Sequence, residues 1–367
     1  MRKIKSIAFI FYSISRAGGT YNALRLMQYL NYLNYKSFGI DLSKIVSTSN
    51  KKVLYRILRF SEYRIPLFKY SRSISSLSPE IPDADCYIAT FWPTAYLASK
   101  LSCERDVPSF YYIQHFEPIF YPNSYIYYLA ERTYRLPLFQ LTISRWLTTF
   151  VTKYSNKVMY VGYFLDPTFL RQSRREKCPR WIDDLKKKNF KIILGIYRPE
   201  WWKGSNLLSR ALISLSKNRK DIIAVIIGEF QNSRLDFPHI KLGWVSRGEL
   251  LKLYSCADVF VYTSYYEGFG LPPLEAMACG VPVVTTDNLG SRDFAVPGIN
   301  ALLVPRDPEA IAQAVTRVLS DEDLRESLVR EGLRTAHRFS IEDAVRRFES
   351  ALKEGCEEFY NFHHGCV

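Results

Sequence analysis

The sequence predicts an α/β protein with two domains, and three observations lead to this fold class. Apolar runs that suit buried parallel strands alternate with segments of helical periodicity along most of the chain. A length of 367 residues exceeds what one hydrophobic core usually holds. Hydrophobic residues make up 47% of the sequence, which is typical of a globular protein, and no run of apolar residues is long enough to span a membrane.

The first domain is expected to span residues 1–168. Its N-terminal residues are basic and then apolar, as in a signal peptide, but they lack a small-residue cleavage site, so we interpret them as the first strand. Further strands with helices between them are predicted from apolar runs. The predicted strands cover residues 4–13, 37–42, 84–91, 108–115, 139–144 and 157–161.

Two places in this domain carry candidate ligand contacts. Gly18 and Gly19 follow the first strand, where a tight strand-to-helix turn explains a glycine pair as well as a ligand contact does. His115 ends the strand 108–115, and ligands of open α/β sheets bind at the carboxyl ends of strands. A histidine there can donate a hydrogen bond or titrate near neutral pH, although a structural role is the alternative.

Residues 44–72 differ in character from the rest of the domain. They carry eight Lys or Arg residues and one acid, with aromatic and apolar residues interleaved. We interpret them as an amphipathic helix in a membrane interface, and the alternative is a helix on the sheet with a solvated basic side. Single-stranded nucleic acid also favours basic and aromatic residues, but no nucleic-acid fold signature accompanies them, so nucleic acid is disfavoured as a partner.

Charge is distributed unevenly along the chain. Residues 1–189 carry a net charge of +16 and residues 190–367 a net charge of −2. This imbalance suggests that the basic half faces an anionic partner, such as a membrane surface or a lipid phosphate.

The segment 169–189 is expected to be a basic linker between the domains. The seven cysteines of the chain are scattered and form no CxxC pair. We therefore expect reduced thiols in the cytoplasm, and neither a disulfide framework nor a metal site.

The most informative stretch lies in the second half, between the apolar runs 259–264 and 282–286, which suit buried parallel strands. A glycine loop and a short helix join the two runs. Gly268 and Gly270 allow the backbone to approach a ligand closely. The N–H groups of Gly270 and Leu271 are predicted to lie at a helix N-terminus, which favours an anion such as phosphate.

Two carboxylates, Glu267 and Glu275, flank this predicted anion site. A carboxylate repels phosphate, but it accepts hydrogen bonds from hydroxyl groups, and sugars offer many hydroxyls. A phosphate site with a hydroxyl acceptor on each side suits a nucleotide sugar. The alternative is an ordinary strand–turn–helix with two solvated glutamates.

The segment EGFGLPPLEAMACGVPVV, with its Glu-x7-Glu spacing, closely resembles the signature of family 4 glycosyltransferases, also called glycosyl transferases group 1. The resemblance covers nearly all of residues 190–340 and is looser before them. It implies the GT-B fold, in which two doubly wound Rossmann-like domains face each other across a cleft. The domain 1–168 would then bind the acceptor and 190–340 the donor, while residues 341–367 would form a crossover helix and a tail.

The resemblance also implies roles for single residues. Arg198 and Lys203 match the Arg…Lys-Gly pair that clamps the donor diphosphate, and Gly18 and Gly19 match the loop that closes on it. His115 matches the active-site histidine near the sugar.

The remaining matches lie in the donor domain. Val245 lies where the family holds the nucleotide base, largely through its backbone, so the base cannot be read from side chains. Glu267 would hold the sugar hydroxyls and Glu275 the ribose hydroxyls. The donor loop is completed by Gly268, Phe269, Gly270 and Leu271.

The implied activity is the transfer of a sugar, with retention of its anomeric configuration, from a nucleoside-diphosphate sugar to a glycan or lipid-phosphate-linked acceptor in polysaccharide assembly. Neither a metal nor a cofactor is implied. A lipid-linked acceptor would hold the enzyme at the inner face of the membrane. A GT-B epimerase or phosphorylase, and a non-catalytic basic binding module, are the alternatives.

Overall fold

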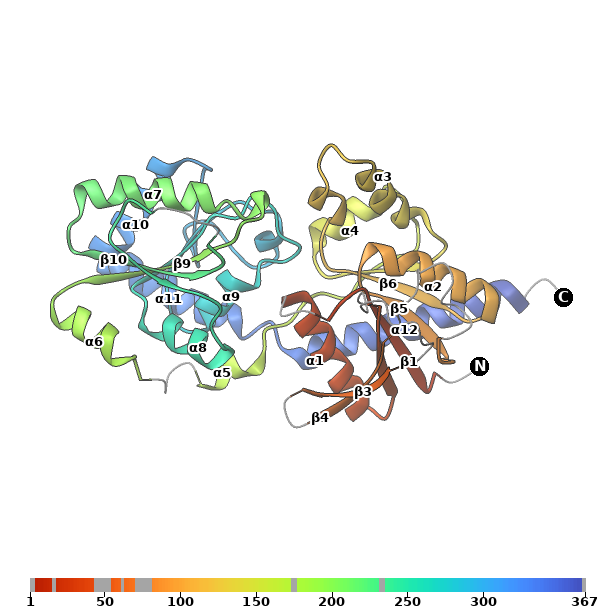
Figure 1. Ribbon diagram of the computed structural model, residues 1–367. Coiled ribbons are helices and arrows are strands. Elements are labelled where there is room, and N and C mark those ends of the chain that lie inside the picture. The colour runs from red at the N-terminus through yellow and green to blue at the C-terminus, as the bar shows by residue number, and fades with distance from the viewer. Residues whose placement is uncertain are drawn as a thin grey trace. The chain divides into compact units, whose positions relative to one another are not determined.

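Two compact units make up the structure (Figure 1). Unit 1 combines residues 1–163 with residues 341–367, and unit 2 comprises residues 164–340. The computed structural model describes residues 4–14, 18–42, 54–60, 63–69, 81–172, 177–230 and 235–364.

Unit 1 is built on an eight-stranded sheet in the order β3-β4-β2-β1-β5-β6-β7-β8. Neighbouring strands are parallel, except for the antiparallel pair β3 and β4. The central strands are almost fully buried, as expected for a parallel sheet covered on both faces. The strands are β1 (Ser6–Phe11), β2 (Lys36–Asp41), β3 (Leu54–Phe60), β4 (Tyr63–Lys69), β5 (Cys86–Ala89), β6 (Ser109–Ile113), β7 (Phe139–Thr142) and β8 (Val158–Tyr160).

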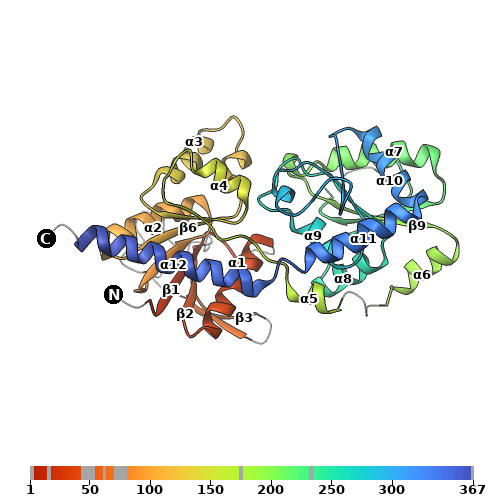
Figure 2. The same cartoon turned by 180° about the vertical axis from the view of Figure 1, so that it is seen from behind.

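Helices cover both faces of this sheet. α1 and the long helix α12, drawn in blue in Figure 2, lie on one face, and α2 and α4 lie on the other. Residue ranges are α1 (Gly18–Tyr32), α2 (Trp92–Arg105), α3 (Tyr125–Arg132), α4 (Arg145–Val151) and α12 (Ile341–His364), with 3₁₀ turns η3 (Glu117–Phe120) and η4 (Thr133–Arg135).

The predicted amphipathic helix in residues 44–72 is wrong where the structure describes this segment. Residues 54–60 and 63–69 form strands β3 and β4, which pair with each other, and β4 also pairs with β2. Both segments are rich in Tyr, Phe and Ile, which suit a strand, and Pro66 disfavours a helix interior. Pairing between β4 and β2 begins at Leu67, directly after the proline that cannot donate to a ladder. The rest of 44–72 lies outside the described residues.

Residues 341–367 are expected to hold a helix and a tail, and in the structure helix α12 takes up most of this range because it continues to His364. Gly355 suggested a helix end, since glycine commonly terminates helices. In the structure its role is close packing: a Cβ atom on Gly355 would lie 2.7 Å from a ring carbon of Phe110 and 3.1 Å from Phe139.

Unit 2 contains a six-stranded parallel sheet in the order β11-β10-β9-β12-β13-β14. Strand order reverses between β9 and β12, and ligands of such sheets bind beyond the carboxyl ends of the strands at this point. The strands are β9 (Lys191–Tyr197), β10 (Ile222–Gly228), β11 (His239–Leu242), β12 (Val259–Tyr262), β13 (Val283–Thr286) and β14 (Leu302–Val304).

The helices of unit 2 also form two layers. α7 packs with α10 on one face, and α9 packs with α11 on the other (Figure 1). The expected linker 169–189 contains most of α5 and all of α6, and both helices belong to unit 2. Residue ranges are α5 (Pro167–Gln172), α6 (Arg180–Lys187), α7 (Ser205–Asn218), α8 (Arg247–Cys256), α9 (Leu271–Ala278), α10 (Pro308–Ser320) and α11 (Glu322–Ala336), with 3₁₀ turns η5 (Trp201–Lys203) and η6 (Gly290–Asp293).

The expectation that all cysteines are reduced is wrong for one pair. A disulfide joins Cys178, just before α6, to Cys256, the last residue of α8, with their Cα atoms 5.7 Å apart. The two cysteines are 78 residues apart in the chain, so no local spacing pattern signals their contact. Free thiols among the described residues are Cys86, Cys103, Cys279 and Cys356.

No helix within the described ranges combines the length and apolar character needed to cross a membrane.

Candidate functional site

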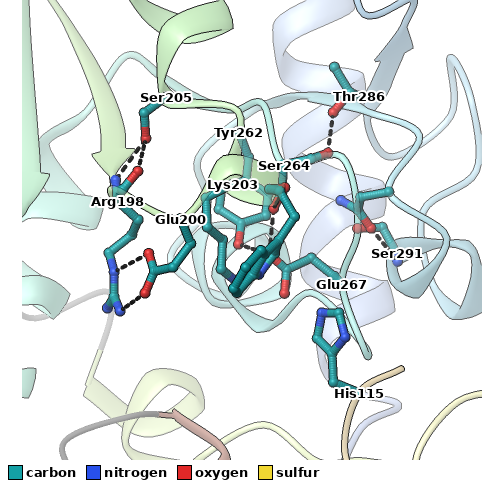
Figure 3. Close-up of polar contacts among 12 residues, drawn as sticks. His115, Arg198, Glu200, Lys203, Ser205, Tyr262, Ser264, Glu267, Thr286 and Ser291 are labelled. Carbon is teal, nitrogen blue, oxygen red and sulfur yellow. Dashed lines mark hydrogen bonds and ion pairs between the residues drawn. The ribbon is translucent and has the colours of Figure 1, made fainter. Parts of the chain in front are cut away.

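Lys203 and Glu267 meet at the carboxyl edge of the unit 2 sheet, where the strand order reverses. Lys203 ends the turn that follows β9, and Glu267 follows the neighbouring strand β12. The Lys203 ammonium lies 2.7 Å from Oε1 of Glu267 (Figure 3). Two residues predicted separately from sequence, 64 positions apart, are therefore brought into direct contact.

Glu267 is held by two further donors besides Lys203. The hydroxyls of Tyr262 and Ser264 each donate to its Oε1 at 2.6 Å, and the carboxylate is 7% exposed (Figure 3). A buried carboxylate is costly unless charges and donors surround it, and here three donors converge on one oxygen. The side chain is thus fixed in one orientation before any ligand binds.

The sequence predicts Tyr262 and Ser264 only as part of a buried strand and indicates no role for them in the site. Their spacing of two residues was a usable signal, because alternate residues of an extended segment share a face. Burial with a carboxylate at hydrogen-bond distance raises the pKa of the Tyr262 phenol well above its usual range, so this hydroxyl stays protonated as a donor.

Glycines shape the loop on both sides of Glu267. Gly204 has a φ of +64°, and a Cβ atom there would lie 2.0 Å from the backbone oxygen of Thr263. Gly270 has a φ of +89° and directly precedes α9, so the predicted glycine loop and helix start are confirmed. Gly290, which sequence reasoning did not single out, packs on the same loop: its Cβ would lie 2.7 Å from the backbone of Phe269.

The start of α9 therefore presents the N–H groups that sequence reasoning assigned to an anion. Gly268, Phe269 and Gly270 are buried, and Leu271 is the first residue of the helix. The partial positive charge of a helix N-terminus lies here, one short loop away from Glu267.

Glu275 lies on α9 and is held by side chains of α8. The Arg247 guanidinium is 3.4 Å from its Oε1, and the Tyr254 hydroxyl donates to its Oε2 at 3.4 Å. Arg247 also lies 3.4 Å from the fully buried carboxylate of Asp166. Burial raises the pKa of the Glu275 carboxyl above its usual range, although Arg247 acts in the opposite direction.

Arg198 occupies its predicted place after β9, but its guanidinium pairs with Glu200 instead of Glu267 or Glu275. Its guanidinium binds both oxygens of Glu200, at 3.2 and 2.7 Å (Figure 3), and lies 4.6 Å from the ring centre of Trp244. Burial would raise the pKa of Glu200, but the hydrogen bonds from Arg198 lower it overall. Val245 follows Trp244 between β11 and α8, at the same edge of the sheet.

Unit 1 brings together the predicted residues of its own sheet edge. Gly18 and Gly19 form the first turn of α1 rather than a loop before it. A Cβ atom on Gly19 would lie 3.0 Å from the side-chain oxygen of Gln114, which directly precedes His115. The His115 ring packs against Phe120 with ring centres 4.8 Å apart, and its Nδ1 lies 3.3 Å from the oxygen of Phe116.

A buried carboxyl group, Glu117, anchors the segment that carries His115. Its Oε2 accepts hydrogen bonds from the Trp92 backbone at 2.6 Å and from the Tyr111 hydroxyl at 2.7 Å. The Tyr134 hydroxyl lies within hydrogen-bond distance of both the Glu117 N–H and the His115 oxygen. Burial raises the pKa of Glu117 to about 8. Sequence reasoning missed this residue, since nothing in the local pattern distinguishes it from a solvated glutamate.

Among the described residues, no three His, Cys, Asp or Glu side chains gather as a metal site would require.

Two family models match the chain. Residues 179–335 match glycosyl transferases group 1, and residues 16–145 match the N-terminal domain of WsaF. Among curated proteins, the O-antigen chain mannosyltransferase B of Escherichia coli is 42% identical over 112 residues, which cover 30% of this chain and 29% of that protein. The D-inositol 3-phosphate glycosyltransferase of Corynebacterium urealyticum is 33% identical over 176 residues, which cover 43% of this chain and 41% of that protein. The chain thus matches less than half the length of these relatives.

Solved structures extend the likeness over the whole fold. Sucrose-phosphate synthase of Thermosynechococcus elongatus has a TM-score of 0.76 at 16% identity, with 95% of this chain and 98% of that chain covered. Anabaena HepE in complex with UDP-glucose has a TM-score of 0.75 at 16% identity, with 95% of this chain and 99% of that chain covered. These likenesses confirm the GT-B fold predicted from the sequence. The match of residues 179–335 to glycosyl transferases group 1 confirms the family resemblance that the sequence suggests for this part of the chain.

Proposed function

We propose that the protein is a retaining glycosyltransferase that uses a nucleoside-diphosphate sugar as donor and a glycan or lipid-phosphate-linked hydroxyl as acceptor. One observation carries the proposal: Lys203, Tyr262 and Ser264 fix the Glu267 carboxylate beside the N-terminus of α9. A fixed carboxylate accepts hydrogen bonds from sugar hydroxyls, while the helix N-terminus favours the diphosphate.

The transfer breaks the bond between C1 of the sugar and the diphosphate oxygen. A bond forms between C1 and the acceptor oxygen on the same face, and the acceptor proton passes to the departing phosphate oxygen. Negative charge on the diphosphate grows during this step, so groups already aimed at it lower the barrier. The N–H groups of Gly270 and Leu271, with the cations of Arg198 and Lys203, fill this role.

The ion pairs of both cations are compatible with this assignment. An ammonium has three donors, so Lys203 can hold Glu267 and still donate to a phosphate oxygen. A guanidinium has five N–H donors, and the contact with Glu200 uses two of them. The proposal also takes over the roles that the family resemblance implies for His115 at the sugar, for Glu275 at the ribose, and for Gly18 and Gly19 at the diphosphate.

The likeness to an O-antigen chain mannosyltransferase and, over 102 residues at 35% identity, to the capsular polysaccharide glycosyltransferase CapM of Staphylococcus aureus supports a place in polysaccharide assembly. Both names refer to surface polysaccharides. We propose a substrate of that class for this chain, with a donor whose leaving group is UDP, GDP or another nucleoside diphosphate.

The test is incubation of the full chain with a panel of nucleoside-diphosphate sugars, with release of the nucleoside diphosphate as the readout. We expect hydrolysis of one donor without acceptor. Lys203→Ala should slow this hydrolysis by about two to three orders of magnitude, as loss of a preorganised charge stabiliser does. Glu267→Gln should lower turnover more than it weakens nucleotide binding, because only the sugar contact changes.

Glu322→Gln is the matched control, since Glu322 lies on α11 with its side chain 74% exposed and pairs with Arg325 one turn further along the same helix. It should behave as the unmodified protein. Turnover of every donor at the buffer rate would reject the proposal. Conversion of the donor to another nucleotide sugar, with no sugar transferred to water or an acceptor, would indicate an epimerase instead.

A further inference from the structure

A tryptophan lies half exposed at the edge of the candidate site. Trp201 begins the turn η5, and 46% of its surface is exposed, whereas most large apolar side chains of unit 2 are buried. The same turn carries Lys203, so part of the indole ring is open to solvent close to a residue of the candidate site. Its position, two residues before a site residue, suggests contact with a ligand.

The exposed ring of Trp201 is framed by other aromatic side chains. It lies edge-on to Trp202, with ring centres 6.1 Å apart, and to Tyr266, with ring centres 5.9 Å apart. Tyr266 directly precedes Glu267, so this aromatic cluster adjoins the fixed carboxylate. The Arg306 guanidinium lies 5.1 Å from the ring centre of Tyr266 and supports that ring.

The backbone holds these rings in place before any ligand binds. The oxygen of Trp202 accepts hydrogen bonds from the N–H groups of Tyr265 at 2.7 Å and Tyr266 at 3.4 Å. Arg306 donates to the oxygen of Tyr265 at 2.6 Å. The positive φ of Gly204 then lets η5 lie directly against Thr263. The turn and the loop before Glu267 are therefore one rigid unit.

The geometry of η5 separates Trp201 from the donor sugar. A 3₁₀ turn has three residues per turn, so its successive side chains project about 120° apart. Lys203 projects toward Glu267, which is proposed to bind the donor sugar. Trp201 must project in another direction, beside Glu267 rather than toward it.

We infer that the half-exposed ring of Trp201, with Tyr266 packed edge-on beside it, forms a platform on which a pyranose ring of the acceptor glycan stacks. This inference rests on the proposed function, and it adds a contact from unit 2 to an acceptor that the sequence assigns to residues 1–168. Aromatic rings offer a flat apolar face with low conformational entropy, which suits the C–H face of a sugar. The platform would place the acceptor sugar next to the donor sugar held by Glu267, and it would select acceptors with a flat apolar face.

The first experiment measures binding directly. Saturation-transfer NMR is recorded with methyl α-mannopyranoside, methyl α-glucopyranoside and methyl α-rhamnopyranoside, each in excess over the full chain with UDP or GDP present. We expect transfer to the ring protons of at least one pyranoside, and its loss in Trp201→Ala. Absence of transfer for all three sugars with the unmodified protein would overturn the platform.

The second experiment separates acceptor from donor, using the donor found by hydrolysis and the same pyranosides as acceptors. Trp201→Ala should raise the acceptor KM by about 3- to 10-fold, the size of an aromatic contact, and leave acceptor-free donor hydrolysis unchanged. Trp201→Phe should recover part of the loss. A fall in donor hydrolysis instead would show that the ring holds the donor sugar, and this would overturn the acceptor assignment.

Tyr32→Ala is the matched control, because Tyr32 is a 55% exposed aromatic residue at the end of α1 opposite Gly18 and Gly19. It should alter neither quantity. Equal melting temperatures of all variants exclude unfolding. If the unmodified protein hydrolyses no donor, the proposed function is wrong. If it hydrolyses a donor but Trp201→Ala changes neither the saturation transfer nor the acceptor KM, only the platform is wrong.

Discussion

At the scale of single residues, the buried carboxyl of Glu117 predicts how the stability of unit 1 depends on pH. Burial raises its pKa to about 8, from an ordinary value near 4.5. Between these two values the folded chain keeps a proton that the unfolded chain has lost. The free energy of unfolding should therefore fall as pH rises from about 4.5 to about 8, and then level off as far as this group is concerned.

Thermal unfolding between pH 5 and 9 tests this dependence. Glu117→Gln keeps an oxygen that can accept the bonds from Trp92 and Tyr111 and carries no charge, so its melting temperature should fall less over this range. Glu104→Gln, at a half-exposed position on α2, should follow the unmodified protein. Identical pH profiles for the unmodified protein and Glu117→Gln would contradict the prediction.

The same scale shows what the sequence could reveal about the site. Glu267, Glu275, Gly270 and Lys203 were recognisable because they lie in short local patterns. Their partners were not: Arg247 reaches Glu275 from 28 residues away, and only the fold brings the two together. Local spacing indicates the candidate site residues, and tertiary packing decides which other side chains hold them.

At the scale of elements, the disulfide between Cys178 and Cys256 ties the segment before α6 to the end of α8. Cross-linking residues 78 positions apart removes freedom from the unfolded chain, a stabilisation on the order of 4 kcal/mol in the chain-entropy model. Reduction should therefore lower the melting temperature of unit 2. Because α8 also carries Arg247 and Tyr254, donor affinity should weaken as well.

Scanning calorimetry with and without a reducing agent measures this effect, and the double variant Cys178→Ser with Cys256→Ser should melt like the reduced protein. Cys103→Ser controls for thiol chemistry, because Cys103 is exposed and free. If the reduced and the oxidised protein melt at the same temperature, the disulfide does not stabilise unit 2.

Elements also show where local reasoning fails. The buried strands of both sheets were predictable, since continuous apolar runs between glycine and proline signals have few alternatives. Strands β3 and β4 were not, because an interleaved pattern of basic and apolar residues fits one face of a helix and an edge of a sheet alike. The pairing of β4 with β2 decides for the strand, and the sequence of residues 54–69 alone does not reveal this partner.

At the scale of the whole molecule, the excess of basic residues in positions 1–189 predicts attachment to anionic membranes. A net charge of +16 lies in this part of the chain. Each Lys or Arg near an anionic bilayer contributes about 1 kcal/mol, so three or four together give reversible attachment that salt weakens. This prediction no longer depends on an amphipathic helix.

Co-sedimentation with vesicles that contain phosphatidylglycerol, compared with phosphatidylcholine alone, measures the attachment at low and at high salt. We expect the protein in the pellet only with the anionic vesicles at low salt. If the protein stays in the supernatant under all conditions, the prediction of membrane attachment is wrong. The excess positive charge would then serve only to steer an anionic substrate.

Helix α12 belongs to unit 1 but is the last helix of the structure to be synthesised during translation. Phe348 of this helix packs against Phe9 and Tyr112 of unit 1, yet the ribosome makes it after all of unit 2. The face of the unit 1 sheet that α12 covers therefore stays open to solvent and chaperones while residues 164–340 emerge. Unit 2 is continuous in the sequence, so it can fold before unit 1 is complete. Unit 1 cannot complete its fold until α12 has been synthesised.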